Sequence, residues 1–294
     1  PISNPPREPN LVPLCRTDAQ LEAVIAGGFS EVELDWMELV GLERAVSRAR
    51  RAGLTVTIAT LRVQKPGEEG YDRRIARLEP DGLLVRHWGA LEYFRRADAA
   101  GGVTRPVLHG DFSLNVSNAA TAGFLLERGL ADLTPAHDLD RTQLGNLLDR
   151  VDPARVTIVL HHHIATFHTE HCVYAHLLSK GKDYRDCGRP CEAHTVALRD
   201  RTGDEHPVVV DVGCRNTVFN ARAQTAAAHA ADLAALGVRR FRVEFVRESE
   251  VETASVLSAY RALLAGTEGV AAVVGRVGAL ERFGVTSGTL RVLA

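Results

Sequence analysis

The 294-residue sequence lacks a strong net charge, a long hydrophobic run and a secretion signal. Its formal charge of −2 gives no overall attraction to nucleic acid or to an anionic membrane. No apolar run approaches the roughly 18 residues that a membrane helix needs. Residues 1–10 contain neither Met nor an apolar signal core, which indicates a cut or processed start and leaves open that the chain is a fragment of a longer protein. We therefore expect a cytoplasmic protein without membrane insertion.

Several catalytic and nucleotide-binding motifs are also missing. The sequence has no G-x-S-x-G elbow and no HExxH motif, which disfavours the common serine-hydrolase and zinc-protease mechanisms. It has no Walker or Rossmann fingerprint, so nucleotide cofactors are not indicated. A radical-SAM cysteine triplet is excluded because its third position is His194.

Cysteine is scarce but clustered. Four of the five cysteines and eight of the twelve histidines lie within residues 161–220. In a chain without an export signal, clustered thiols are more typical of metal ligands than of disulfides. The fifth cysteine, Cys15, lies in a hydrophobic segment, and we expect it to be a thiol of the core.

The spacing of the four clustered cysteines favours an iron–sulfur cluster. They are separated by 14, 3 and 22 residues, in the order Cys172, Cys187, Cys191 and Cys214. A structural zinc site usually draws on two tight knuckles, and only the middle pair is that close. Four thiolates on separate loops suit an iron–sulfur cluster better. Buried structural thiols, a zinc site with four cysteine ligands and disulfides stay open as alternatives. The cations that we expect to lower the thiol pKa values are Lys180, Lys182, Arg185, Arg189 and Arg215.

From residue 10 onward, short strand-like runs alternate with amphipathic helical runs. Seven βα units are clear, and residues 208–213 (VVVDVG) would add an eighth strand. The alanine-rich residues 221–237 predict one long helix. This rhythm predicts an α/β fold, an irregular TIM-like (β/α)8 barrel over residues 10–270. Residues 161–220 would be its cysteine-rich metal-binding insertion near strand seven, and residues 271–294 a C-terminal tail.

In such a barrel the chemistry lies at the C-terminal ends of the strands. Two strands, 31–36 and 239–245, alternate in polarity and flank the first strand in a closed barrel. Glu33 and Arg242 would then meet near the axis, either as a buried pair that fills the barrel or as part of a group that orients substrate. The other polar residues at predicted strand ends, each of which has helix capping or loop hydration as an alternative role, are Asp35, Arg86, His87, His109, Asp111, His137, His161, His162, His163 and Glu244.

Long segments of the chain resemble the collagenase-like peptidase family U32. They are residues 167–192, which contain three of the cysteines, residues 198–220, which contain the fourth, and residues 284–290. Residues 109–139 resemble the barrel segment of the family with its LN-x-x-N element, here Leu114, Asn115 and Asn118. The family's Gly-Ser/Ala-x-Cys signature is replaced by Thr169-Glu170-His171 before Cys172, which indicates a divergent branch.

The resemblance implies a TIM-like barrel whose four cysteines hold a [4Fe–4S] cluster. Family members of this kind support oxygen-independent hydroxylation of RNA or of a ubiquinone precursor, and others are labelled collagenases. We therefore expect a [4Fe–4S] redox enzyme that supports hydroxylation of RNA or a small aromatic substrate, with a redox partner or partner subunit. The alternatives are a collagenase-like protease and a barrel with a structural zinc site made by the four cysteines. The candidate catalytic residues are Asp111, Asn115, His163, Arg242 and Glu244.

Overall fold

The structure is a computed structural model that describes residues 8–99, 105–181, 184–281 and 283–290. Lys182, one of the cations expected beside the thiolates, lies outside the described residues. In the part of the chain that is described, no helix is both long enough and apolar enough to cross a membrane.

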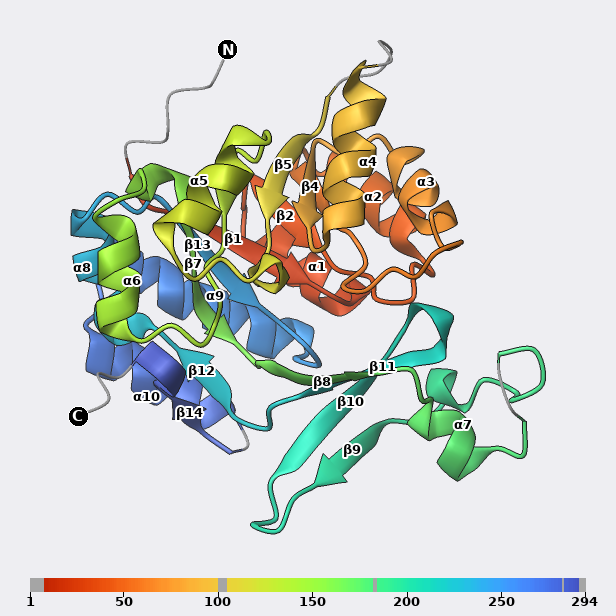
Figure 1. Cartoon of the computed structure of the whole chain (residues 1–294). Helices are drawn as coiled ribbons and strands as arrows, with labels where there is room; N and C mark the ends of the chain where they lie inside the picture. The colour runs from red at the N-terminus through yellow and green to blue at the C-terminus, as the bar shows by residue number, and fades with distance from the viewer. Residues whose placement is uncertain (1–7, 100–104, 182–183, 282, 291–294) are drawn as a thin grey trace.

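The main body is a curled ten-stranded sheet surrounded by helices (Figure 1). Eight strands pair in parallel in the order β7-β13-β1-β2-β3-β4-β5-β6. A further parallel bridge joins Leu133 in β6 to Val156, the residue before β7. The eight strands are β1 (Asn10–Cys15), β2 (Glu31–Leu34), β3 (Thr55–Ala59), β4 (Gly82–Val85), β5 (Val107–Gly110), β6 (Asp132–Leu133), β7 (Thr157–His162) and β13 (Arg240–Glu244).

Helices follow these strands in the predicted βα order. They are α1 (Asp18–Ala26), α2 (Leu42–Arg51), α3 (Gly70–Ala76), α4 (Trp88–Ala99), α5 (Ala119–Glu127), α6 (Arg141–Leu148), α8 (Ala230–Ala235) and α9 (Glu250–Leu264). The segment predicted as a C-terminal tail begins inside α10 (Val270–Leu280), whose Val273 and Val277 lie in the main core. The predicted α/β fold is confirmed.

Two sequence-based assignments are wrong. The run 208–213 does not supply a barrel strand, because it lies at the end of β10 (Glu205–Asp211) in a second sheet. That antiparallel sheet has the order β8-β11-β10-β9, and Figure 1 shows it with α7 (Val173–Leu178) to one side of the main body. Its other strands are β8 (Ala165–Thr169), β9 (Val196–Arg199) and β11 (Arg215–Phe219).

The prediction of one long helix over residues 221–237 is also wrong. Residues Ala223–Thr225 form β12, which pairs antiparallel with β7 and parallel with β14 (Val285–Thr286), and only Ala230–Ala235 form an α-helix. Pairing with β7 therefore overrides the helix propensity of the alanines.

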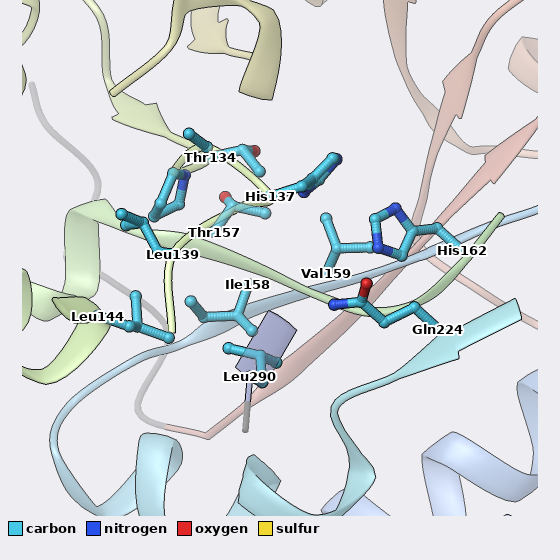
Figure 2. A pocket seen from close by; sticks show the side chains of 12 residues that line it. Thr134, His137, Leu139, Leu144, Thr157, Ile158, Val159, His162, Gln224 and Leu290 are labelled. Atoms are coloured by element: carbon cyan, nitrogen blue, oxygen red, sulfur yellow. The ribbon is translucent and has the colours of Figure 1, made fainter. Parts of the chain in front are cut away.

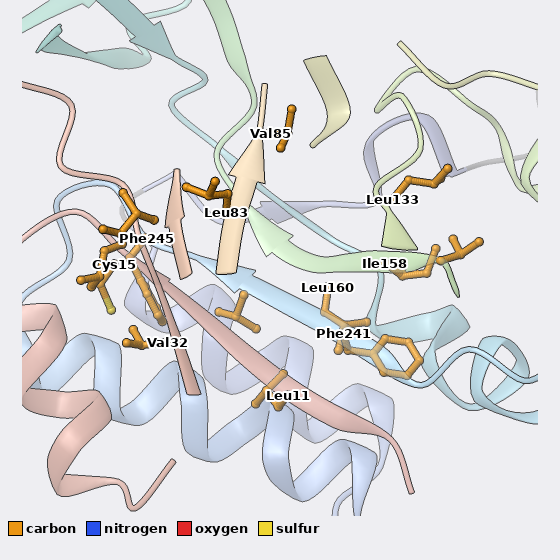
Figure 3. Packing of buried hydrophobic residues seen from close by; sticks show 14 of the residues in the cluster. Leu11, Cys15, Val32, Leu83, Val85, Leu133, Ile158, Leu160, Phe241 and Phe245 are labelled. Carbon is orange, nitrogen blue, oxygen red and sulfur yellow. The ribbon is translucent and has the colours of Figure 1, made fainter. Parts of the chain in front are cut away.

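The strands separate two kinds of interior. Side chains on one face of each strand, such as Val32, Leu83 and Phe241, pack under the helices in the main hydrophobic core (Figure 3). Cys15 belongs to this core, as expected, and is fully buried. The opposite faces carry polar side chains such as Glu33, Thr57 and Arg242, together with a small apolar cluster of Leu14, Ala59 and Leu84. The interior of the curled sheet is therefore largely polar.

Arg242 is the best-paired cation of this polar interior. Its guanidinium lies 2.6 Å from Asp111, 3.2 Å from Glu33 and 2.9 Å from Glu244, and the side chain is about 1% exposed. The predicted meeting of charges from strands 31–36 and 239–245 is therefore confirmed. All three distances involve a buried carboxylate, so Arg242 stabilises the interior as well as any site above it.

We expect Arg242→Ala to lower the free energy of unfolding by about 3–5 kcal/mol, because it leaves buried carboxylates without their cation. Urea unfolding measures this change. The matched control is Arg141→Ala, whose surface pair with Asp232 should contribute less than about 1 kcal/mol. Equal stability losses in the two variants would contradict the assigned role of Arg242.

Candidate functional site

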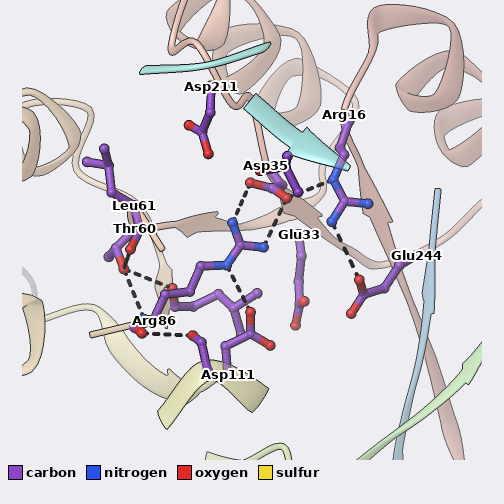
Figure 4. A network of polar contacts seen from close by, with 12 residues as sticks. Arg16, Glu33, Asp35, Thr60, Leu61, Arg86, Asp111, Asp211 and Glu244 are labelled. Carbon is purple, nitrogen blue, oxygen red and sulfur yellow. Dashed lines mark hydrogen bonds and ion pairs between the residues drawn. The ribbon is translucent and has the colours of Figure 1, made fainter. Parts of the chain in front are cut away.

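Six buried side chains form a closed ring of alternating charge at the C-terminal ends of the strands, which we call the charge ring. Figure 4 labels all of its members except Arg242. Arg86 joins Asp35, at 2.6 and 2.9 Å, to Asp111, at 2.8 Å. Arg16 joins Asp35, at 2.8 Å, to Glu244, at 3.5 Å. Arg242 closes the ring between Glu244 and Asp111. Sequence analysis singled out every member of the ring except Arg16.

The two aspartates of the charge ring stay charged near neutral pH. Burial raises the pKa of Asp35, but Arg86 and Arg16 outweigh burial and hold that pKa below its ordinary value. Burial also raises the pKa of Asp111, but Arg242 and Arg86 outweigh burial and hold that pKa well below its ordinary value. Groups held so firmly in their charged forms act as fixed charges rather than as proton donors.

Three polar side chains next to the charge ring are less completely paired. Burial, followed by the Asp35 carboxylate, raises the pKa of Asp211 to about 7. His168 Nδ1 lies 3.8 Å from an Asp211 oxygen, and its Nε2 has no hydrogen-bond partner in the described chain. Burial and then Arg86 lower the pKa of Arg62, whose Nη1 is also without such a partner there. A carboxyl that titrates near neutral pH beside unpaired donors is typical of a functional site.

Asp211 and His168 belong to the insertion between β7 and β12, which docks on the loops of the main body. Arg215 forms ion pairs of 2.7 Å with Glu68, in the loop after β3, and with Glu170. Arg247, after β13, donates to the Val208 carbonyl at 2.7 Å. The insertion therefore lies over the charge ring and brings its own polar groups to it.

The same insertion carries the four clustered cysteines, which are close enough to affect one another. Burial and then Glu38 raise the pKa of Cys191 to about 11, and the Cys172 and Cys187 thiols add to the rise. Burial also raises the pKa of Cys214, again with a contribution from both of those thiols. The four side chains are free thiols and partly exposed.

Backbone amides point at the cysteine sulfurs. The Ala175 amide donates to Cys172 at 3.5 Å, because Cys172 caps the N-terminus of α7. The Arg189 amide donates to Cys187 at 3.4 Å, and the Tyr184 amide donates to Cys214. Arg189 and Cys214 adopt positive φ angles of 52° and 61°, a costly conformation for residues other than glycine. The loops are thus shaped to direct donors at sulfur.

The cations expected to lower the thiol pKa values do not give Cys191 and Cys214 a lowered pKa, although Arg189 does interact with Cys191. Burial and the neighbouring thiols dominate there. Arg215 is instead bound by Glu68 and Glu170, and Arg189 lies 2.9 Å from Glu192.

The remaining predicted site residues are dispersed. His163 lies 3.3 Å from Glu281, away from the charge ring, whereas the pKa of His162 is influenced by Glu244 and Arg242 of the ring. His109 is paired with Asp132 at 2.6 Å. Asn115 is exposed and adopts a left-handed turn (φ 56°) before α5, so its observed role is conformational.

Two more histidines complete the set of predicted strand-end residues. His137 stacks on Phe112 at 4.2 Å, and burial lowers its pKa to about 3. His87 is partly buried beside Asp72, and burial lowers its pKa. Neither histidine is a member of the charge ring.

The architecture is that of an α/β protein with a curled parallel sheet and a thiol-bearing insertion over its polar mouth. The model of peptidase family U32 matches residues 33–271, and the chain belongs to that family. No curated protein matches it.

Among solved structures, the chain is similar to a U32 peptidase, with 12% identity, 82% of this chain and 94% of that chain covered, and a TM-score of 0.48. It is also similar to aminoacrylate-bound tryptophan synthase from M. tuberculosis, with 13% identity, 94% of each chain covered and a TM-score of 0.44. It is similar as well to thiamine phosphate pyrophosphorylase from Pyrococcus furiosus, with 10% identity, 92% of this chain and 97% of that chain covered, and a TM-score of 0.39.

We expect Asp211→Asn to change how stability depends on pH. A carboxyl whose pKa rises on folding to about 7 takes up a proton, so its contribution to stability falls as pH increases from about 4 to about 7. Asparagine does not titrate, and the variant should gain on the wild type across that window by up to about 1.4 kcal/mol per unit of pKa change.

Urea unfolding at about pH 5 and about pH 8 measures this gain, because the two values bracket most of the titration. Asp232→Asn, on the exposed surface of α8, should show no such pH-dependent difference. A variant that differs from the wild type equally at both pH values would contradict the raised pKa of Asp211.

Proposed function

We propose that Cys172, Cys187, Cys191 and Cys214 hold a [4Fe–4S] cluster and that the chain is a redox enzyme of the hydroxylating kind. The observation that carries the proposal is the gathering of four free thiols, with backbone amides aimed at their sulfurs, on an insertion that docks over a polar mouth. Hydrogen bonds to sulfur stabilise a thiolate-ligated cluster and raise its reduction potential. When bound, the cluster supplies one-electron transfer.

A single zinc ion would need the four sulfurs closer together than they lie in the described structure. Four thiolates around one zinc ion at about 2.3 Å lie roughly 3.8 Å from one another. Among the described residues, the group whose ligand atoms lie within 4.8 Å of one another is His161, Glu248 and Glu281, and the four cysteines form no such group. A multi-iron cluster holds its cysteines farther apart than a single ion does.

The substrate would bind between the insertion and the charge ring. There Asp211 can take up or release a proton near neutral pH, while Arg62 and His168 offer unpaired nitrogen atoms. The charge ring orients these groups, and its arginines hold the pKa values of Asp35 and Asp111 below their ordinary values. The complete eight-stranded barrel that places this mouth at its C-terminal end is part of the proposal, supported by the parallel bridge between Leu133 and Val156.

The side chains next to the charge ring suit an aromatic substrate, either an RNA base or a small aromatic molecule. Phe112, which stacks on His137, also lies 5.3 Å from the Arg62 guanidinium. The cavity in Figure 2, lined by His137, His162 and Gln224 among others, has a volume of about 40 Å³. It has room for only a few water molecules and is too small to hold such a substrate.

We expect replacement of any one of Cys172, Cys187, Cys191 or Cys214 by Ser to reduce bound iron and sulfide several-fold after anaerobic purification, because a cluster needs all four thiolates. Iron and sulfide analysis measures this. Cys15→Ala, in the hydrophobic core, is the matched control and should keep the wild-type content. Equal iron content in the wild type, the four Ser variants and Cys15→Ala would contradict the cluster proposal.

Removal of the metal should make the insertion sensitive to protease. Binding to the folded form alone stabilises the loops that carry the ligands. We expect cuts between Thr166 and Asp211 in the metal-free protein, while the flanking βα units stay intact. Limited proteolysis followed by mass spectrometry locates the cuts. Identical digests with and without metal would contradict the proposal that a bound metal stabilises the insertion.

The family name points to peptide hydrolysis as a second candidate function. Asp35 and Asp211 interact electrostatically. The pKa of Asp35 is lowered and that of Asp211 is raised, so the pair could serve as base (Asp35) and acid (Asp211). Hydrolysis of gelatin that survives the Cys187→Ser change but not Asp211→Asn would favour the peptidase. Absence of hydrolysis in the iron-loaded wild type would favour the redox enzyme.

A further inference from the structure

A second group of potential ligands lies away from both the thiols and the charge ring. It consists of His161, His163, Glu248 and Glu281, which we call the His–Glu cluster. His163 Nε2 lies 3.3 Å from Glu281 Oε2 and 3.6 Å from Glu248 Oε1, and His161 Nε2 lies 3.4 Å from Glu281 Oε1. Both histidines are at least nine-tenths buried.

The two histidines lie two residues apart and therefore on one face of the strand, and a β-bulge determines which face that is. The register between β13 and β7 shifts after Arg242, so that Val243 is opposite His161 and Leu160 becomes the extra residue. Leu160 packs in the main core, and His161 contacts Tyr260 of α9. His163 follows two residues later and contacts Glu281 just after α10, whereas His162 faces His137.

The free atoms of the cluster are arranged as metal ligands. His163 Nδ1 lies 2.7 Å from the Asn220 carbonyl, which can only accept, so Nδ1 carries the hydrogen. In the neutral imidazole, Nε2 then presents its lone pair to two carboxylates. Within the described residues, His161 Nε2 and Glu248 Oε1 are buried without any hydrogen-bond partner. Lone pairs that face one another in a buried site need either a proton or a metal cation between them.

The spacing fits a metal ion. Ligand atoms about 2.0–2.2 Å from a tetrahedral metal lie roughly 3.3–3.6 Å apart. The distances of 3.3 and 3.6 Å from His163 Nε2, and of 3.4 Å from His161 Nε2, match this spacing, and the two histidines contact different oxygens of Glu281. The ligand atoms that all lie within 4.8 Å of one another come from His161, Glu248 and Glu281, and His163 is a fourth, more distant donor. The partners of the outer ring nitrogens, Asn220 and Tyr260, correspond to the hydrogen bonds that orient metal-bound histidines.

We propose that the His–Glu cluster binds one divalent transition-metal cation, independently of the thiol site. Two imidazoles and two carboxylates are ligands that zinc, iron(II) and manganese(II) accept. His163, Glu248 and Glu281 line a cavity of about 250 Å³, so the bound ion faces a space that can hold water or a small ligand. Among the other residues that line it is Glu252, whose side chain caps α9.

Manganese(II) is the probe that separates this site from the cysteines, because nitrogen and oxygen ligands take it whereas thiolates prefer softer metals. The full chain, purified anaerobically, is titrated with Mn²⁺ while the electron paramagnetic resonance signal of the free ion is followed. We expect one bound ion per chain. Glu281→Gln and His163→Gln should each weaken binding by at least about ten-fold, since even loss of an orienting partner costs that much.

Two controls accompany the titration. Glu252→Gln changes a carboxylate of the same cavity but keeps a side chain that can complete the capping box of α9, and it should bind Mn²⁺ as the wild type does. Cys187→Ser should also bind normally. Circular dichroism confirms that each variant is folded.

Absence of Mn²⁺ binding in the wild type would overturn the proposal and leave the cluster as an ion pair between protonated His163 and Glu281. Equal binding by the wild type and both ligand variants, or loss of binding in Cys187→Ser, would overturn it as well.

Discussion

The charge ring is the constraint on which the rest of the site depends. Arg16, Asp35, Arg86 and Asp111 each come directly after a strand, and Arg242 and Glu244 lie within β13. Each ion pair between two of these strands fixes the relative position of their ends. Buried charges are costly unless every one is paired, so the ring is stable only as a closed set.

The insertion depends on this constraint. Arg215, Arg247 and the backbone of Val212 attach it to loops of the main body, the last through a 3.1 Å hydrogen bond to the Met37 carbonyl. Asp211 is thereby held beside Asp35, and repulsion between the two carboxylates joins burial in raising the pKa of Asp211. The cysteine loops belong to the same docked unit, so a metal bound there would lie on the same side of the charge ring as Asp211.

Sequence reasoning predicted the parts of the fold that follow from local pattern. The alternation of polarity around Glu33 and Arg242 was enough to predict their meeting in the interior. The same reasoning failed where long-range pairing decides. Residues 208–213 look like a barrel strand, but residues 208–211 pair within the second sheet, with β9 and β11. It missed Arg16, although its position directly after β1 was a usable signal, and Asp211 and His168, which only docking brings to the charge ring. The bulge that determines which face His161 and His163 occupy has no signature in the sequence.

The central claim is that the four clustered cysteines hold a multi-iron cluster above the charge ring. Mössbauer spectroscopy of the anaerobically purified protein, enriched in iron-57, tests it most directly, because the spectrum reports the number and valence of iron sites bound by sulfur. The account predicts the signature of a [4Fe–4S] cluster in the wild type. A protein that contains zinc and gives no iron spectrum, or one whose iron is mononuclear, would contradict the claim.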